Sequence, residues 1–300
     1  NFHPRTFTLP EDLAALHQAA DESSAARWIL KPARLGQGVG VELLSDLRGL
    51  PIEGGWVVQE YVARPHLLEG FKYTMRLFVL ITSLDPLLVY LYPDGLVKRA
   101  ALPFSADTTV TDRLRHLTNP TVVRRQGGGD ATGRNLSLAA YLERQQAEGV
   151  DVGALWAELR RIVVSTVLAA REPMLGAQRA EGVPPGGTFQ LLGLDVTLDE
   201  HMKPWLLECN ITPSLEVEGV AASPYAVAEH GVKQSLLRDV VSLIRVLTDW
   251  DAEVGGAPQA QSAEGIRARA AAELAQCGRF ERVFPTPDSA ACLSLFPVPR

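Results

Sequence analysis

The run from Leu192 to Glu216 carries side chains that suit a metal ion. Asp195 lies in one apolar run, Glu208 and Asn210 close the next, and the polar turn between them predicts a β-hairpin. Glu208 and Asn210 are two residues apart and therefore share one strand face, while Asp195 lies at a similar distance from the turn. Two carboxylates and an amide oxygen are hard ligands that suit Mg²⁺ bound with the phosphates of a nucleotide. The alternative is that the carboxylates pair with basic neighbours.

A glycine loop follows a short strand that ends in a lysine. Lys31 closes the strand, and Gly36, Gly38 and Gly40 follow within the sequence LGQGVGV. Glycines let the backbone approach a phosphate closely, and the lysine adds a point charge for the same phosphate. The spacing matches neither a P-loop nor a dinucleotide fingerprint, because the loop leads into another strand. Taken alone, the motif is equally typical of an ordinary hairpin loop.

The apolar strand that starts at Trp56 ends in four residues that could face a nucleotide base. They are Gln59, Glu60, Tyr61 and Val62. Backbone donors and acceptors at the end of such a strand could bind an adenine. A plain core strand explains this segment equally well when it is considered alone.

A strand with three polar side chains on one face is predicted at Lys72, Thr74 and Arg76, which alternate along the sequence. Lys98 and Arg99 on the next strand extend the basic surface. Arg76 can bind a carboxylate or phosphate through two hydrogen bonds, whereas the lysines act as point charges. The hypothesis is one wall of a charged cleft, and the alternative is a solvated sheet face.

The segment His116–Asn119 could line the same site or cap a turn, and His116 alone does not establish acid–base catalysis. Basic residues and the glycine loop therefore come early in the chain, and the oxygen ligands come late. That order is typical of a site in which two β-rich lobes enclose Mg-ATP.

Composition restricts the class of protein. The chain has 300 residues, 46% hydrophobic and 21% charged, with a formal net charge of -6. The acidic balance argues against a nucleic-acid binder held by bulk charge, and no apolar run reaches the roughly 18 residues that span a membrane. Three cysteines without pair spacing favour a cytoplasmic protein. The start at Asn1, without a methionine, suggests that upstream sequence is missing.

The pattern of elements divides the chain into three parts. Residues 1–62 are expected to form a central lobe with the glycine loop and the adenine hinge, and residues 63–249 a C-terminal lobe with the metal site. Residues 250–300 are interpreted as an Ala/Pro-rich appendage, partly disordered, with one helix over 262–276. Other helices are expected at 11–26, 136–148, 151–170 and 230–247. Strands are expected at 28–31, 41–44, 56–62, 73–82, 87–91 and, after a turn at Asp94-Gly95, 96–101.

These motifs, in this order, resemble the tubulin tyrosine ligase-like family of ATP-grasp ligases. The resemblance rests on WILKP, the end of the glycine loop, VVQEYV, the run from Glu69 to Val97, HLTN, the LGLDVTL and PWLLECN strands, and the helix from Gly231 to Leu243. It covers residues 2–247 and leaves out the tail. It implies an α/β (α+β) fold of the ATP-grasp type, with two β-rich lobes and flanking helices around Mg-ATP.

The resemblance also implies roles for individual residues. Lys31 and Lys72 would contact the phosphates of ATP, with Gly38, Gly40 and Thr74 beside the nucleotide. Gln59, Glu60, Tyr61 and Val62 would form the adenine hinge, and Asp195, Glu208 and Asn210 would hold magnesium. Arg76 and Lys98 would line the region where the acceptor carboxylate, the transferred phosphate and the incoming amino acid meet.

Four positions depart from the family pattern. The family usually has aspartate at Thr74 and arginine at Lys98, often has arginines at Gln37 and Val39, and has tyrosine or a similar residue at Pro120. The first change weakens a nucleotide contact, and the second loses the geometry of a guanidinium. The magnesium ligands and both lysines are retained, which favours an active enzyme.

The implied reaction is ATP-dependent amide or isopeptide bond formation through an acyl phosphate. The resemblance is strongest to the branch that adds glutamate or glycine to a glutamate side chain. It implies a monomer that acts on an acceptor protein with an acidic tail, tubulin or another protein, and binds neither nucleic acid nor membrane. Two alternatives remain: a catalytically weak or inactive module that binds nucleotide or an acidic tail, and a ligase that acts on a small peptide.

Overall fold

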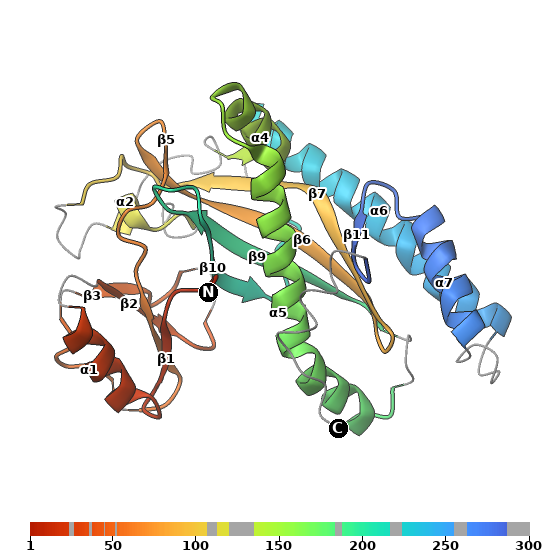
Figure 1. Ribbon diagram of the computed structural model, residues 1–300, viewed down its shortest axis with the longest axis horizontal. Helices are drawn as coiled ribbons and strands as arrows, with labels where there is room; N and C mark the ends of the chain where they lie inside the picture. Colours follow the sequence, from red (N-terminus) through yellow and green to blue (C-terminus); the bar gives the residue numbers. More distant parts are fainter. Residues whose placement is uncertain are drawn as a thin grey trace.

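The computed structural model describes residues 1–23, 27–35, 38–44, 46–51, 53–106, 113–119, 135–183, 188–216, 224–254 and 263–286. Within these ranges the chain forms two antiparallel sheets flanked by helices, a mixed α/β architecture. Figure 1 shows the smaller sheet at one side of the molecule and the larger sheet, with the long helices, at the other. No helix in these ranges is long and apolar enough to cross a membrane.

The smaller sheet has the strand order β1-β4-β2-β3. It comprises β1 (Thr6–Leu9), β2 (Trp28–Pro32), β3 (Glu42–Leu44) and β4 (Trp56–Glu60). Helix α1 (Leu13–Glu22) covers one face, where Leu16 packs with Trp28 and Val58. Because side chains alternate along a strand, Lys31 and Gln59 lie on the opposite face. That face is turned toward the larger sheet, since the Lys31 ammonium reaches the carbonyl oxygen of Leu207.

The larger sheet has the order β10-β9-β6-β7-β11, with β5 beside β6 and β8 beside β7. Its strands are β5 (Leu67–Leu68), β6 (Phe71–Leu84), β7 (Leu87–Arg99), β8 (Leu136–Ser137), β9 (Gln190–Leu198), β10 (Pro204–Asn210) and β11 (Glu281–Phe284). The helices that accompany it are α2 (Arg113–His116), α4 (Leu138–Ala147), α5 (Val152–Ala180), α6 (Pro224–Val254) and α7 (Ala263–Ala275). Helices α5 and α6 are longer than the sequence pattern predicts.

Different helices cover the two faces of the larger sheet. Met75 and Leu77 of β6 pack with α4 and α5, whereas Phe78 and Leu80 pack with Leu236 of α6. Figure 1 shows α5 crossing the sheet, with α6 on its other side. The hairpins β6–β7 and β9–β10 supply most of this sheet, as the sequence predicts.

The polar face of β6 is buried. Lys72, Thr74 and Arg76 have exposed fractions of 5%, 6% and 8%. By alternation they share the α6 face of the sheet with Phe78 and Leu80. The interpretation of these three residues as a solvated sheet face is therefore wrong, and their burial requires partners.

Strand β7 is continuous from Leu87 to Arg99, so the predicted turn at Asp94-Gly95 is wrong. Gly95 lies opposite Leu77 in the ladder, and a Cβ atom there would come within 2.2 Å of the carbonyl oxygen of Arg76. Asp94 instead accepts hydrogen bonds from the backbone amides of Gly95 and Ala139. The Asp-Gly pair therefore permits a close approach of two strands and anchors α4.

Part of the tail belongs to the larger sheet, as strand β11 (Glu281–Phe284). Helix α7 is close to the predicted 262–276 helix, but β11 pairs antiparallel with β7, and Phe280, Val283 and Phe284 are buried. The interpretation of the tail as an appendage is wrong for residues 263–286, because these side chains complete both hydrophobic cores. Residues 255–262 and 287–300 lie outside the described ranges.

Truncation of a β11 side chain tests this assignment. We expect Val283→Ala to lower the free energy of unfolding by about 1–3 kcal/mol, because it removes apolar atoms from a packed core. Leu274→Ala on α7, whose side chain is 45% exposed, serves as the control and changes the same quantity by roughly 0.5 kcal/mol or less. Urea unfolding followed by circular dichroism measures both. Equal, small effects would show that β11 contributes nothing to the sheet.

Candidate active site

A pocket of about 790 Å³ lies between the two sheets. It has the size of a pocket for a small molecule or cofactor. Twelve of the fourteen residues proposed for the site line it, and the two that do not are Gly40 and Arg76. The pocket residues are Lys31, Gly38, Gln59, Glu60, Tyr61, Val62, Lys72, Thr74, Lys98, Asp195, Glu208 and Asn210. The structure thus brings together motifs that are separated by up to 180 positions in the sequence.

Asp195 and Glu208 lie opposite each other in the β9–β10 ladder. The pKa of Glu208 is raised, first by partial desolvation of its carboxyl group at the pocket wall and then by the negative charge of Asp195 beside it. Asn210 donates hydrogen bonds from Nδ2 to the carbonyl oxygen of Gly193, at 3.2 Å, and to Glu208 Oε1, at 3.2 Å. Its amide oxygen makes no hydrogen bond to the described part of the chain and remains available as a ligand.

Arg76 binds Asp195 through two hydrogen bonds. Its Nε donates to Oδ1, and its Nη2 donates to Oδ2 at 2.9 Å. Burial alone would raise the pKa of Asp195, but the charge and hydrogen bonds of Arg76, with help from Lys98, lower it to about 2. Asp195 is therefore ionised at neutral pH. The guanidinium stands behind Asp195, so Arg76 reaches the pocket only through this carboxylate.

Three lysines face the same pocket. The Lys31 ammonium donates to Gln59 Oε1 at 2.7 Å, and the Lys72 ammonium donates to the Tyr61 hydroxyl at 2.9 Å. Burial lowers the pKa of Lys31 and of Lys98, although Asp195 acts in the opposite direction on both. The pKa of Lys72 falls to about 7, through burial and then through the charge of Lys31. Buried cations around a pocket create a strong demand for an anionic ligand.

A bulge in β10 connects the two sheets. The register shifts between Leu206 and Glu208, which leaves Leu207 out of the ladder. The Leu207 carbonyl oxygen instead accepts hydrogen bonds from Lys31, at 3.4 Å, and from Gln59, at 3.5 Å. The bulge therefore fixes the smaller sheet against the strand that carries Glu208.

The hinge and the glycine loop border the pocket. Strand β4 ends at Glu60, and Tyr61 and Val62 leave the sheet to line the cavity. The Glu60 side chain points away, to an ion pair with Arg5 at 2.9 Å. In the loop, Gly38 and Gly40 have φ values of 69° and 71°, which favour glycine, and Gly40 packs against Pro32. Gly36 and Gln37 lie outside the described residues.

The geometry agrees with a comparison of sequences. The model of the Tubulin-tyrosine ligase family matches residues 1–252 of the chain. The chain belongs to the tubulin-tyrosine ligase family. The mixed α/β fold with antiparallel sheets is consistent with that family.

Several family members with assigned activities are similar over most of the chain. Tubulin monoglutamylase TTLL4 of Mus musculus is 32% identical over 251 residues, which are 81% of this chain and 20% of that protein. Tubulin polyglutamylase TTLL7 of Homo sapiens is 32% identical over 263 residues, 82% of this chain and 29% of that protein. Tubulin polyglutamylase TTLL5 of Mus musculus is 30% identical over 254 residues, 81% of this chain and 18% of that protein. The chain therefore spans less than a third of the length of these relatives.

The donor set of the pocket suits magnesium. Among the described residues, no cluster of three or more histidine, cysteine, aspartate or glutamate side chains could hold a metal ion. The set in this pocket is two adjacent carboxylates and an amide oxygen, which is incomplete without oxygens from a ligand. Because Mg²⁺ is commonly held by one or two carboxylates together with substrate phosphates, these residues fit the ion.

The pocket also contains residues that the motif analysis did not select. They include Thr6, Ile29, Ala33, Arg34, Val57, Leu207, Cys209, Ile211 and Thr212. Ile29 and Val57 lie two residues from Lys31 and Gln59, so strand alternation places them on the same face. The two-residue spacing in the sequence could therefore have identified Ile29 and Val57 as pocket residues. The segment His116–Asn119, which the sequence left open between a site and a cap, lines the pocket.

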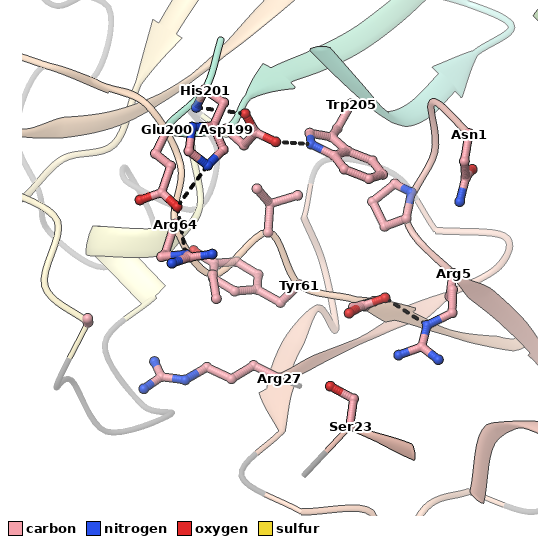
Figure 2. Close-up of a pocket in the computed structure, with 15 residues that line it drawn as sticks. Asn1, Arg5, Ser23, Arg27, Tyr61, Arg64, Asp199, Glu200, His201 and Trp205 are labelled. Carbon is pink, nitrogen blue, oxygen red and sulfur yellow. Dashed lines mark hydrogen bonds and ion pairs between the residues drawn. The ribbon is translucent and has the colours of Figure 1, made fainter. Parts of the chain in front are cut away.

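A second cavity of about 730 Å³ lies on the other side of the hinge. Figure 2 shows Trp205 directed to Asp199, Arg64 directed to Glu200, and Arg27 extending along the cavity. Three arginines, Arg5, Arg27 and Arg64, and three carboxylates, Glu60, Asp199 and Glu200, line this cavity, so their side-chain charges balance in number. It has no excess charge and carries none of the proposed magnesium ligands.

Proposed function

We propose that this chain is an ATP-dependent ligase that joins the amine of glutamate to the side-chain carboxylate of a glutamate in an acidic protein segment. Addition of glycine is the close variant of this reaction. The observation that carries the proposal is the pair Asp195 and Glu208, held together in a pocket that also presents Lys31 from the smaller sheet and Lys72 from the larger sheet. Membership of the tubulin-tyrosine ligase family and similarity to proteins named as tubulin glutamylases support it.

The fold that we propose is an ATP-grasp fold, with residues 1–62 and 63–249 as the two lobes that enclose Mg-ATP. Lys31, Lys72 and the backbone near Gly38 and Gly40 bind the phosphates, with Thr74 beside them. Gln59, Glu60, Tyr61 and Val62 form the adenine hinge. The free amide oxygen and the paired carboxylates suit Asp195, Glu208 and Asn210 as ligands of magnesium. When it is bound, the ion supplies charge neutralisation at the transferring phosphoryl group.

In the proposed reaction an oxygen of the acceptor carboxylate attacks the γ-phosphorus of ATP, and ADP leaves. The amine of the incoming amino acid then attacks the acyl carbon of the resulting acyl phosphate. Inorganic phosphate leaves, and the amine proton passes to solvent. Lys98, half-buried at the pocket, attracts the acceptor carboxylate. Arg76 keeps Asp195 ionised and oriented, so it acts as a positioning residue for that ligand.

The partners of the reaction follow from the same proposal. The acceptor is a protein with an acidic tail, tubulin or another protein, and the donor is free glutamate or glycine. We propose a monomer located in the cytoplasm, where cysteines such as Cys209 and Cys277 stay reduced.

One observation favours a different function. Arg76 engages both oxygens of Asp195, one of the proposed ligands. A module that binds nucleotide or an acidic tail without turnover would tolerate this arrangement. Magnesium-dependent ATP hydrolysis separates the two functions, because only the ligase consumes ATP.

Incorporation of a labelled amino acid tests the proposal. The protein is incubated with Mg-ATP, a mixture of acidic proteins and labelled glutamate, glycine or tyrosine in separate reactions. The control is Asp195→Asn, which keeps the shape of the side chain and removes its charge. Incorporation of one amino acid that disappears in the control supports the ligase and identifies its donor. Absence of both incorporation and ATP hydrolysis would overturn it.

A further inference from the structure

We propose that His116 is a positioning residue for the phosphate-binding lysine Lys72, and that it acts through the hydroxyl group of Tyr61. The proposal rests on the proposed function, in which Lys72 binds a phosphate of ATP. It assigns the Tyr61 side chain a role beyond the hinge backbone, and it assigns His116 a role apart from contact with substrate.

Three side chains form a continuous hydrogen-bonded chain. The Lys72 ammonium donates to the Tyr61 hydroxyl at 2.9 Å, and the same hydroxyl lies 3.0 Å from His116 Nδ1. The rings of Tyr61 and His116 meet edge to face, with centroids 5.7 Å apart. All three residues are buried, with exposed fractions of 5% for Lys72, 6% for Tyr61 and 3% for His116.

The chemistry of these groups fixes the direction of the chain. In its charged, phosphate-binding state the Lys72 ammonium can only donate, so the Tyr61 oxygen accepts from it. The single phenolic proton is then directed to His116 Nδ1, which accepts it only when that nitrogen carries no proton. Burial raises the pKa of Tyr61, so the hydroxyl keeps its proton. The proposal therefore requires that Nδ1 of His116 carries no proton.

This chain supplies the hydrogen-bonding requirement of Lys72. In the part of the chain that the structure describes, the Tyr61 hydroxyl is the one acceptor bonded to the Lys72 ammonium. A buried ammonium without an acceptor is costly, and it would be free to turn away from the pocket. Tyr61 lies in the hinge next to strand β4, whereas Lys72 lies on β6, so the bond also joins the two sheets.

The segment around His116 is attached to β6 at two points. His116 reaches Lys72 through Tyr61, and two residues later Thr118 Oγ1 lies 2.8 Å from Thr74 Oγ1. The His116 ring also meets Phe104 edge to face, at 5.6 Å between centroids. His116 and Thr118, two residues apart, thus connect to Lys72 (through Tyr61) and to Thr74, which are also two residues apart. These contacts fix the position of the segment along the polar face of β6.

A second tyrosine–histidine pair in the same chain provides a matched control. The Tyr73 hydroxyl lies 2.8 Å from His66 Nδ1, and the two rings meet edge to face at 5.8 Å. Tyr73 is also buried, but it bonds Tyr141 instead of a lysine and faces the core beside α4. The two pairs share their chemistry, their ring geometry and the burial of the tyrosine, and they differ in the contact with Lys72.

The experiment removes one oxygen atom from each pair in the full chain. Tyr61→Phe is expected to weaken binding of Mg-ATP, measured by titration calorimetry, by about 10-fold or more, since it deletes a hydrogen bond to a charged group. Tyr73→Phe is expected to leave that dissociation constant within about twofold of the wild type. It is expected to lower folding stability about as much as Tyr61→Phe does, because each variant loses a buried hydroxyl group. Equal ATP affinities in the two variants would overturn the proposal.

Variants of His116 separate positioning from packing. Asparagine places an acceptor oxygen near the position of Nδ1, whereas leucine fills the site without an acceptor. We expect His116→Leu to weaken Mg-ATP binding and His116→Asn to restore most of it. Indistinguishable affinities in these two variants would show that His116 only fills space, and would overturn the proposal.

A measurement without nucleotide keeps this inference distinct from the proposed function. Acetylation of Lys72 by acetic anhydride in the free protein, quantified by mass spectrometry, is expected to rise about threefold or more in Tyr61→Phe and His116→Leu, because the amine loses its acceptor. If reactivity rises and the wild type binds no ATP, the proposed function fails while the contact between His116 and Lys72 stands. Unchanged reactivity in both variants would overturn the positioning role.

Discussion

Replacing Glu208 with glutamine is expected to lower kcat by about 10³-fold or more, because it removes one carboxylate from the set that would hold magnesium at the transferring phosphoryl group. The change keeps the size and shape of the side chain. It removes the charge that lies beside Asp195 in the β9–β10 ladder. We therefore expect activity and stability to respond in opposite directions.

The stability effect follows from the sign of the pKa shift. The pKa of Glu208 is raised in the folded protein, by burial and by Asp195. A raised carboxyl pKa means that the folded state binds the proton more tightly than the unfolded state. The folding stability that this proton contributes is present at low pH and is lost as pH rises through the folded pKa. At neutral pH without a cation, the midpoint of thermal unfolding of Glu208→Gln should thus equal or exceed that of the wild type.

Two measurements check this variant. Added Mg-ATP should raise the unfolding midpoint of the wild type more than that of Glu208→Gln, because the ion can add to the binding energy only where both carboxylates are present. Glu200→Gln, in the turn of the same hairpin, is the control and should retain turnover, because Glu200 forms a surface ion pair with Arg64. Normal turnover in Glu208→Gln would remove Glu208 from the ligand set.

The hairpin of Asp195, Glu208 and Asn210 was predictable because two short-range rules determine it. The two-residue period of a strand places side chains on faces, and the polar turn sets the register. The same rules predicted that Lys72, Thr74 and Arg76 share a face. They could not predict that Arg76 would stand behind Asp195, because that contact depends on the pairing of β6 with β9 across more than 100 residues.

The errors have a common cause in tertiary structure. The Asp94-Gly95 pair has the local pattern of a hairpin turn, yet the strand continues, because glycine is needed where the Arg76 carbonyl approaches. The run at 281–284 is too short to identify a strand on its own, and pairing with β7 supplies what the local sequence lacks. In both cases a contact distant in sequence overrides the local pattern.

Binding of Mg-ATP is expected to take up close to one proton at pH 8, because Lys72 is largely neutral in the free protein. Its pKa is about 7, lowered first by burial and then by the charge of Lys31. At pH 8 roughly nine-tenths of the Lys72 side chains then lack a proton, and the negative charge of a bound phosphate raises the pKa again. Affinity should fall by up to about 10-fold for each pH unit above 7, since each unit makes the required protonation about 1.4 kcal/mol more costly.

Calorimetric titration in buffers of different ionisation enthalpy measures this proton uptake. Lys72→Arg is the matched variant, because arginine stays charged over the whole range and needs no proton on binding. It should bind Mg-ATP with a much smaller proton uptake at pH 8 than the wild type. At pH 6 Lys72 is already protonated in the free protein, so its contribution should vanish in the wild type. The same uptake in Lys72→Arg and wild type at pH 8 would show that another group takes up the proton, and that Lys72 is charged before ATP arrives.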